Sequence, residues 1–235
     1  MSSVADLAIA ILTQAERRVE IAGQNLANAT TPAYKRRVAF SALVSTSANG
    51  DVSSPRVSTA IDFTIGKLSE TGNPADLAIT GPGYFALRSD NATIYSRQGQ
   101  FAISQDGRLV TPQGFALQLT NGSDLVVKSR DFEIRPDGTV YEKGASIGRV
   151  AVFAPAEDRQ LEPIDGGFRA GASALTLADN ASVRQGAIET SNVTTGDEMV
   201  SMIESLRRAE SGQRVMNVYD DLMGRVITTF GDSVR

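Results

Sequence analysis

The sequence predicts an α+β protein in which N- and C-terminal helices form a coiled-coil-like stem and the middle is a mainly antiparallel β domain. Two observations predict this fold. At both ends of the chain, apolar residues recur at alternating spacings of three and four, which is typical of helices that pack along a seam. Between the two ends, short alternating apolar runs are separated by turn residues, which is typical of antiparallel strands.

The N-terminal helix is predicted over residues 1–30. Its seam consists of Ala5, Ala8, Leu12, Ala15, Val19, Ala22 and Leu26. Many of these residues are alanines, so a partner helix can approach closely. Ile9, Ile11 and Ile21 lie off the seam and predict a second contact surface on the same helix. The helix has to end before Pro32, because the residue before a proline disfavours the helical conformation.

The C-terminal helix is predicted over residues 191–235. Eight of the ten seam positions are apolar, and the ten are Met199, Met202, Leu206, Ala209, Gln213, Met216, Asp220, Met223, Ile227 and Phe230. Either Asn192 or Thr194 is predicted to cap its start, with Asp197 and Glu198 near the positive end of the helix dipole. Taken alone, the two seams fit either a helical hairpin within one subunit or contacts between subunits.

The β domain is predicted over residues 75–170. Its turns include Asp-Gly and Asn-Gly pairs, which readily adopt the positive φ that tight hairpins require. The pattern Phe-x-Ile-x-x-Asp-Gly occurs twice, beginning at Phe101 and at Phe132. Because a solenoid needs three or more repeats, we interpret the two copies as similar hairpins.

Two segments connect the β domain to the predicted stem. Residues 31–74 are rich in Ser, Thr and Ala, with a polar stretch at 45–55, and are predicted to be an extended arm with isolated strands. Residues 171–190 are predicted to be the return segment, so that both segments lie beside the same stem.

The composition argues against an enzyme. The chain has no Cys and no His, which excludes disulfides, thiolate ligands and Ser-His-Asp catalysis. Neither a phosphate-binding loop nor a Gly-x-Ser-x-Gly turn is present. We therefore predict no catalytic residue, no cofactor and no metal site. The net charge of −4 also argues against nucleic acid, and the cluster at residues 35–37 is interpreted as a solvated basic turn.

No membrane insertion and no cleaved signal peptide are predicted. The longest apolar run, residues 7–12, is far shorter than the ~20 residues that a membrane-spanning helix needs. Asp6 precedes this run, and a charged segment follows it where a secretory signal has small residues at its cleavage site.

Three parts of the sequence resemble the flagellar rod and hook protein family. Residues 25–35 (NLANATTPAYK) resemble its N-terminal signature, with Ala33 where the family usually has Gly. Residues 70–85 (ETGNPADLAITGPGYF), 95–101 (YSRQGQF) and 106–111 (DGRLVT) resemble the start of its β domain. Residues 189–193 (ETSNV), followed by Glu198, Met199, Val200, Ile203, Arg207 and Glu210, resemble its C-terminal signature, with Ala209 where an aromatic residue is usual.

The resemblance implies a structural subunit of the bacterial flagellar basal body, within the rod that spans the periplasm. Such a subunit is expected to self-assemble through its terminal helices and to transmit torque. Its expected partners are further copies of itself, the proximal and distal rod subunits, and the flagellar type III export apparatus. Residues 147–153 and 166–169, together with the modest length, favour the proximal rod over the distal rod or another axial protein of the family.

The seams and signatures together predict a set of subunit-interface residues. These are Leu12, Val19, Leu26, Asn25, Asn28, Tyr34, Asn192, Met199, Ile203, Leu206, Met216 and Ile227. Two alternatives from other classes are a β-domain adhesin with an internal helical hairpin and a carbohydrate-active enzyme with a helical stalk. The enzyme would need converging carboxylates, which the sequence does not space in that way.

Overall fold

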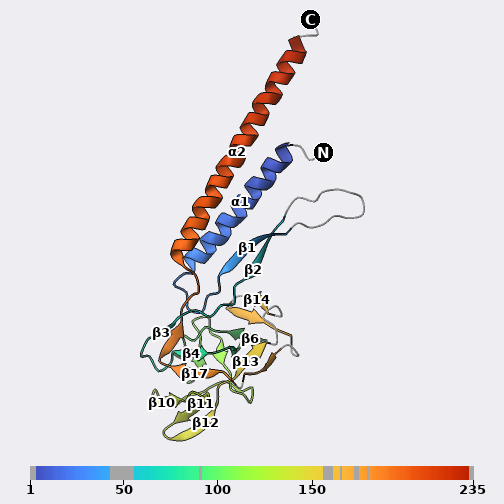
Figure 1. Cartoon of the computed structure of the whole chain (residues 1–235). Coiled ribbons are helices and arrows are strands. Elements are labelled where there is room, and N and C mark those ends of the chain that lie inside the picture. The colour runs from blue at the N-terminus through green and yellow to red at the C-terminus, as the bar shows by residue number, and fades with distance from the viewer. Residues whose placement is uncertain are drawn as a thin grey trace. The chain divides into compact units, whose positions relative to one another are not determined.

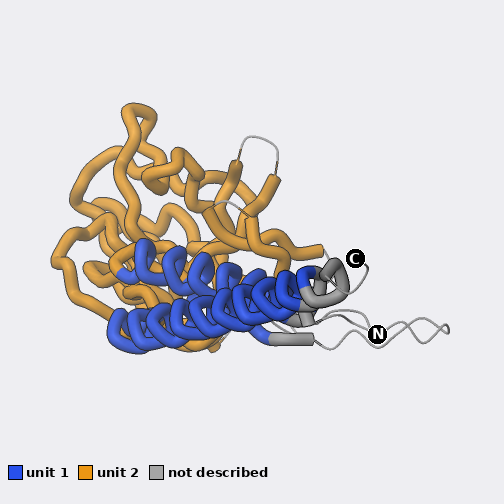
Figure 2. Tube along the Cα trace, turned by 90° about the horizontal axis from the view of Figure 1, so that it is seen from above, with its two compact units in different colours: residues 1–29, 35–62, 193–235 blue, residues 30–34, 63–192 orange. Residues whose placement is uncertain are grey.

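The computed structural model describes residues 4–42, 56–89, 92–155, 161–164, 166–171, 175–178 and 180–232, so the polar stretch at 45–55 lies outside the described residues. The fold is α+β, with one helix at each end and mainly antiparallel sheets between them, which confirms the predicted class (Figure 1). The chain forms two compact units (Figure 2). Unit 1 comprises residues 1–29, 35–62 and 193–235, and unit 2 comprises residues 30–34 and 63–192.

Unit 1 contains both helices and one two-stranded sheet. Its elements are α1 (Val4–Ala27), β1 (Arg37–Ala42), β2 (Arg56–Ile61) and α2 (Thr195–Asp232). The two helices run side by side in opposite directions, and α2, with 38 residues against 24 in α1, continues beyond the N-terminal end of α1 (Figure 1). No helix in the described part of the chain combines the length and the apolar character that crossing a membrane requires.

Small residues line the contact between α1 and α2. Ala8, Ala15 and Ala22 are buried on α1, and Ser205 and Gly212 are buried on α2. A Cβ atom added to Gly212 would lie 3.2 Å from the Cγ of Leu12. The small side chains therefore allow the two backbones to approach closely.

The ends of the helices follow from local hydrogen bonds. At the end of α1, the carbonyl oxygen of Gln24 accepts hydrogen bonds from the Asn28 side chain at 2.8 Å and from the Asn28 backbone N–H at 3.2 Å, which helps to satisfy the carbonyl groups of the last turn. At the start of α2, the N–H of Glu198 donates to the carbonyl of Thr194 at 3.1 Å. Thr194 therefore occupies the N-cap position of α2.

Unit 2 contains the remaining strands in the described part of the chain. They are β3 (Leu68–Glu70), β4 (Leu77–Thr80), β5 (Tyr84–Arg88), β6 (Thr93–Ser96), β7 (Ala102–Ile103), β8 (Leu109–Val110), β9 (Ala116–Leu117), β10 (Phe132–Ile134), β11 (Thr139–Glu142), β12 (Ala145–Arg149), β13 (Val152–Pro155), β14 (Glu162–Ile164), β15 (Gly167–Arg169), β16 (Leu175–Leu177), β17 (Ser182–Gln185) and β18 (Ala187–Glu189).

These strands form one large sheet and three small ones among the described residues. The large sheet has the order β14-β15-β6-β5-β9-β8-β7, and β13 pairs with both β5 and β16. A meander of β10, β11 and β12 forms a second sheet. The return strands β17 and β18 pair with β4 and β3, so the segment that leads into α2 is paired with the start of the β domain.

The two copies of the Phe-x-Ile-x-x-Asp-Gly pattern form matching hairpins, as predicted. The first joins β7 to β8 and the second joins β10 to β11. In each turn, the glycine N–H donates to the carbonyl three residues earlier, from Gly107 to Ser104 and from Gly138 to Arg135. Both glycines have positive φ, 80° and 83°, which explains why glycine follows the aspartate in both copies.

The core of unit 2 is apolar. Its largest fully buried apolar side chains belong to Phe85, Leu77, Ile79, Leu87, Leu109, Leu117, Leu125, Val127 and Val140. The Phe85 ring packs edge-on against Phe101, with 5.9 Å between ring centroids. This core holds together the strands that carry the family-like signatures of the β domain.

Candidate functional site

The candidate functional site is the apolar surface of α2 that points away from α1. Met199, Ile203 and Leu206 follow one another at spacings of four and three, which places them on one face of the helix. Their side chains are 51%, 51% and 49% exposed. Val200, Val215, Val218, Leu222 and Met223 are also exposed. Large exposed apolar side chains of this kind are typical of surfaces that contact another molecule, which makes this face of α2 the candidate site.

Another side of the same helix packs against α1. There, Ser205 and Gly212 are buried, and Met202 reaches to 3.9 Å from the position of a Cβ added to Gly23 of α1. A helix on the surface of a globular protein is apolar on one side and polar on the other. Because α2 is apolar on two sides, its contact with α1 satisfies only one of them.

A buried polar cluster lies where α1, α2 and β1 meet within unit 1. Glu198 of α2 is 2% exposed, and its carboxylate accepts hydrogen bonds from Asn25 Nδ2 at 3.0 Å and from Arg36 Nε at 2.5 Å. The Arg36 contact is also an ion pair. This pairing offsets the cost of burying a carboxylate, which is high for an unpaired charge.

Asn25 also connects α1 to the first strand. Its side chain donates to the carbonyl of Arg37 at 2.8 Å and accepts from the N–H of Arg37 at 2.8 Å. One fully buried amide therefore holds the start of β1 on one side and Glu198 on the other. Asn25, which belongs to the segment that resembles the N-terminal signature, therefore connects α1, β1 and α2 of unit 1.

The interpretation of residues 35–37 as a solvated basic turn is wrong for two of the three residues. Lys35 is 5% exposed, and Arg36 pairs with the buried Glu198. The pairing joins residues 162 positions apart in the sequence. A short run of basic residues does not show that such a distant partner exists.

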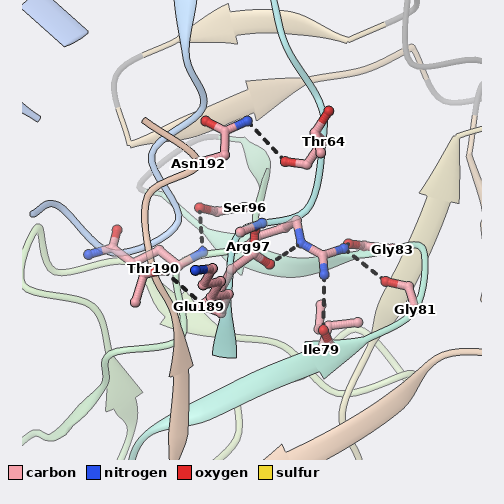
Figure 3. Close-up of polar contacts among 12 residues, drawn as sticks. Thr64, Ile79, Gly81, Gly83, Ser96, Arg97, Glu189, Thr190 and Asn192 are labelled. Carbon is pink, nitrogen blue, oxygen red and sulfur yellow. Dashed lines mark hydrogen bonds and ion pairs between the residues drawn. The ribbon is translucent and has the colours of Figure 1, made fainter. Parts of the chain in front are cut away.

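A fully buried ion pair lies within unit 2 (Figure 3). Arg97 Nε lies 2.5 Å from the Glu189 carboxylate, and the two side chains are 3% and 1% exposed. The other Arg97 nitrogens donate to the carbonyl groups of Ile79, Gly81 and Gly83. The second carboxylate oxygen of Glu189 accepts from the N–H of Gly66 at 2.9 Å.

The Arg97–Glu189 pair joins the signature segments of unit 2. Arg97 belongs to the segment 95–101, its carbonyl partners belong to 70–85, and Glu189 begins the segment 189–193. The carbonyl of Glu189 also accepts the N–H of Ala33 at 2.9 Å, which adds the end of the N-terminal signature. Signatures that lie far apart in the sequence therefore meet around one ion pair.

The sequence missed Arg97, Glu189 and the pairing of Asn25 with Glu198 as positioning residues. The available signal was a polar or charged residue within each family-like segment. Hydrophobic spacing gave no weight to such residues, because it scores only apolar positions.

The predicted interface residues have several different environments. On α1, Leu12, Val19 and Leu26 are half-buried, and Asn25 is fully buried. On α2, Met199, Ile203 and Leu206 are exposed, and Met216 is half-buried. The side chain of Ile227 lies outside the described residues.

Three predicted interface residues lie in the sequence between the two helices and make hydrogen bonds within the chain. Asn28 caps the end of α1. The side chain of Asn192 does not cap α2, because it donates to the carbonyl of Thr64 at 3.0 Å (Figure 3). The Asn192 N–H also donates to the carbonyl of Tyr34 at 3.3 Å within unit 2.

A shallow hollow on unit 2 offers little for chemistry. It has a volume of about 410 Å³ and is lined by Asn73, Pro74, Ala75, Phe101, Ala102, Ile103, Arg130 and Phe132. These lining residues include no carboxylate, whereas glycoside hydrolysis usually requires a pair of them. Among the described residues, no group of three or more His, Cys, Asp or Glu could hold a metal ion.

Comparison with known proteins gives a consistent result for both units. The family model "Flagellar hook protein FlgE/F/G D1 domain" matches residues 78–142, and "Flagellar basal body rod FlgEFG protein C-terminal" matches residues 184–229. The flagellar basal-body rod protein FlgG of Bacillus subtilis is 26% identical, over 90% of this chain and 93% of the relative. The rod protein FlgF of Salmonella typhimurium is 29% identical, over 93% of this chain and 94% of the relative. FlgF of Mesorhizobium japonicum is 27% identical, over 92% of each chain.

Proposed function

The chain belongs to the flagellar basal-body rod protein family, and we propose that it is a structural subunit of the rod that assembles through its terminal helices. In this proposal, residues 1–30 and 191–235 form a coiled-coil-like stem that packs against neighbouring subunits. The β domain of residues 75–170 forms the outer part of the rod, and residues 31–74 and 171–190 connect it to the stem.

The observation that carries the proposal is the second apolar side of α2. Met199, Ile203 and Leu206 remain about half exposed while the other side of the helix packs on α1. Covering these side chains with a neighbouring subunit removes apolar surface from water, which stabilises the contact by about 25 cal/mol per Å². A face that docks on a different face of the next copy gives an open helical polymer when the rotation between copies does not close into a ring.

The proposed interface combines exposed and half-buried residues of both helices. The proposed interface also includes Ile227 and the half-buried residues Leu12, Val19, Leu26 and Met216. Asn25, Asn28, Tyr34 and Asn192 hold the segments that carry the interface. Close-packed contacts of this kind resist deformation, so they are suited to transmitting torque.

The proposed partners are other copies of this chain and the other proximal and distal rod subunits. We further propose that the chain reaches the periplasm-spanning rod through the flagellar type III export apparatus, without cleavage of a signal peptide. Its membership of a family of basal-body rod proteins supports this route.

Within the family, we propose a role in the proximal rod like that of FlgF. FlgF and FlgG relatives match this chain at similar identity, 25–29% and 26–27%, so identity does not separate the two. The segments 147–153 and 166–169 support the FlgF role.

The test places a charge on the exposed side of α2. Ile203→Lys and Leu206→Lys are introduced together into the source bacterium in place of the native gene. We expect rod assembly in isolated basal bodies, and swimming motility, to be lost, because burying two lysines in an apolar contact is unfavourable. Thermal unfolding of the purified chain should change little, because both side chains are exposed.

The matched control places the same charges on exposed polar positions of the same helix. Glu204→Lys and Ser211→Lys are expected to leave rods and motility intact, because both exposed residues lie on a different side of α2 from Met199, Ile203 and Leu206. Normal rods in the Ile203→Lys, Leu206→Lys strain would contradict the proposal.

A further inference from the structure

We propose that the buried contact between Asn25 and Glu198 sets the register in which α1 packs against α2. The starting point is the repetitive character of the helix contact. The buried alanines Ala8, Ala15 and Ala22 recur every seven residues on α1, and the buried Ser205 and Gly212 are also seven residues apart on α2. Sliding one helix along the other by seven residues, about 10 Å, therefore brings similar surfaces together again.

The larger side chains of α1 share this repeat. Leu12, Val19 and Leu26 are half-buried and are also spaced by seven residues. In the observed register, Leu12 packs against Gly212, which has no side chain. A Cβ built on Gly212 would lie 3.2 Å from Leu12 Cγ. After a slide of one repeat, Val19 or Ala5 takes the place of Leu12 beside Gly212. Apolar packing alone therefore distinguishes the registers only weakly.

The polar contacts at the base of the helices do not repeat. From the Asn25–Glu198 contact to the Leu12–Gly212 contact, thirteen residues back along α1 correspond to fourteen residues forward along α2. A slide in one direction exchanges the Asn25 amide for the Arg18 guanidinium opposite Glu198 and takes Asn25 beyond the start of α2. The opposite slide places Ser205 opposite Asn25 and takes Glu198 beyond the end of α1. The amide–carboxylate hydrogen bond of 3.0 Å is therefore specific to one register.

The contact favours one register because a buried carboxylate that loses a hydrogen-bond donor destabilises the protein. Glu198 is 2% exposed, and its carboxylate is held by Asn25 and Arg36. In a shifted register the carboxylate loses Asn25, and Asn25 itself is tied to the backbone of Arg37 at 2.8 Å. A single polar contact inside an apolar helix seam is a known way of fixing register, at some expense in stability.

The register has a consequence for assembly, and this step alone rests on the proposed function. Sliding α2 by one repeat moves Met199, Ile203 and Leu206 two helical turns along α1. The exposed apolar row would then be displaced along the helix axis and would no longer align with its contact surface on a neighbouring subunit. The Asn25–Glu198 contact therefore determines where the assembly surface is presented.

Disulfide trapping in the purified full-length chain tests the register directly. The chain contains no Cys, so introduced pairs report without background. Leu12→Cys with Gly212→Cys reports the observed register, and Leu12→Cys with Tyr219→Cys or with Ser205→Cys reports a slide of one repeat in either direction. Because a disulfide requires Cα atoms within about 7 Å, each pair selects one register.

With the native polar contact, we expect only the Leu12–Gly212 pair to close on oxidation. In the background Asn25→Leu, Glu198→Leu, we expect at least one slide reporter to close about tenfold more than in the native background, while helical content is retained. Removing both partners together avoids leaving an unpaired buried charge. The control Arg17→Leu, Glu20→Leu replaces an exposed ion pair on α1 and is expected to leave the reporters unchanged.

A conservative variant separates register from general stability. Glu198→Gln keeps an oxygen acceptor for Asn25, so we expect it to retain the native reporter pattern. Unchanged reporters in the Asn25→Leu, Glu198→Leu background would overturn the proposal, as would loss of its helical signal. Equal sliding in Glu198→Gln and in the double variant would also overturn it, because sliding would then not depend on the Asn25 contact.

Discussion

At the scale of single residues, Ala33 adopts a backbone conformation that most side chains avoid. Its φ is 58°, in the left-handed region where glycine is favoured. The conformation is held on both sides, because the Ala33 N–H donates to the Glu189 carbonyl at 2.9 Å and the Tyr34 N–H donates to Thr31 at 3.3 Å. The turn at the end of the N-terminal signature is therefore kept even though alanine replaces the usual glycine.

Replacing Ala33 by glycine should relieve this strain. We expect Ala33→Gly to raise the free energy of unfolding by about 0.5–1 kcal/mol, the steric gain less the added freedom of glycine in the unfolded chain. Denaturant unfolding of the purified chain measures it. Ala29→Gly is the control, because Ala29 has a negative φ and should gain nothing. Equal effects from both substitutions would show that Ala33 is not strained.

The Arg97–Glu189 pair should contribute strongly to the stability of unit 2. Glu189→Ala leaves the Arg97 guanidinium, 3% exposed, without its charge partner, so we expect a loss of about 3–5 kcal/mol in thermal or denaturant unfolding. Glu70→Ala is the control, because it removes the partner of Arg184 from an exposed ion pair and should cost less than about 1 kcal/mol. A loss from Glu189→Ala no larger than that of the control would rule out this role.

At the scale of elements, the depth of contact between the two helices depends on glycine as much as on apolar residues. Gly212 is buried, and a Cβ at its position would lie 3.2 Å from Leu12 Cγ and 3.3 Å from Ile11 Cγ2. Gly224, on the same helix, has nothing within 4 Å of such a Cβ. The two glycines therefore provide a matched comparison.

Substitution by leucine should affect stability in opposite directions at Gly212 and Gly224. We expect Gly212→Leu to destabilise the helix pair by about 1–3 kcal/mol, because the added side chain overfills the contact. Gly224→Leu should instead raise helix stability by up to about 1 kcal/mol, because leucine favours helices more than glycine does. Far-ultraviolet circular dichroism during thermal unfolding measures both. Similar effects of the two substitutions would contradict the close approach of α1 and α2.

The sequence predicted the helices and the β domain better than it predicted how the helices face each other. The spacings of three and four identified both ends as helical, and the matching Asp-Gly turns were identified from their repeated pattern. On α2, however, the predicted seam included Leu206 and Gln213, whereas the buried residues are their neighbours Ser205 and Gly212. Serine and glycine carry no apolar signal, so spacing alone cannot identify a contact built on small size.

Some positions were beyond reach of sequence patterns for a different reason. Asn25 and Glu198 are 173 residues apart, and Arg97 and Glu189 are 92 apart. Which charges pair depends on the path of the chain, and local spacing contains no information about that path. The family-like signatures marked the right segments without showing that their polar residues bind one another.

At the scale of the whole molecule, the chain builds two compact units from interleaved segments. Both ends of the chain belong to unit 1, and the β domain between them belongs to unit 2. Each unit contains an ion pair with a buried glutamate, Arg36–Glu198 in unit 1 and Arg97–Glu189 in unit 2. In our proposal, unit 1 supplies the contacts that build the rod, because its helix α2 carries the exposed apolar row.

The most direct test of this proposal is electron cryo-microscopy of basal bodies isolated from the source bacterium. We predict that this chain will be found in the rod, with Met199, Ile203 and Leu206 of each copy covered by the terminal helices of a neighbouring subunit. A rod in which these three side chains face solvent, or a rod that does not contain this chain, would contradict the account.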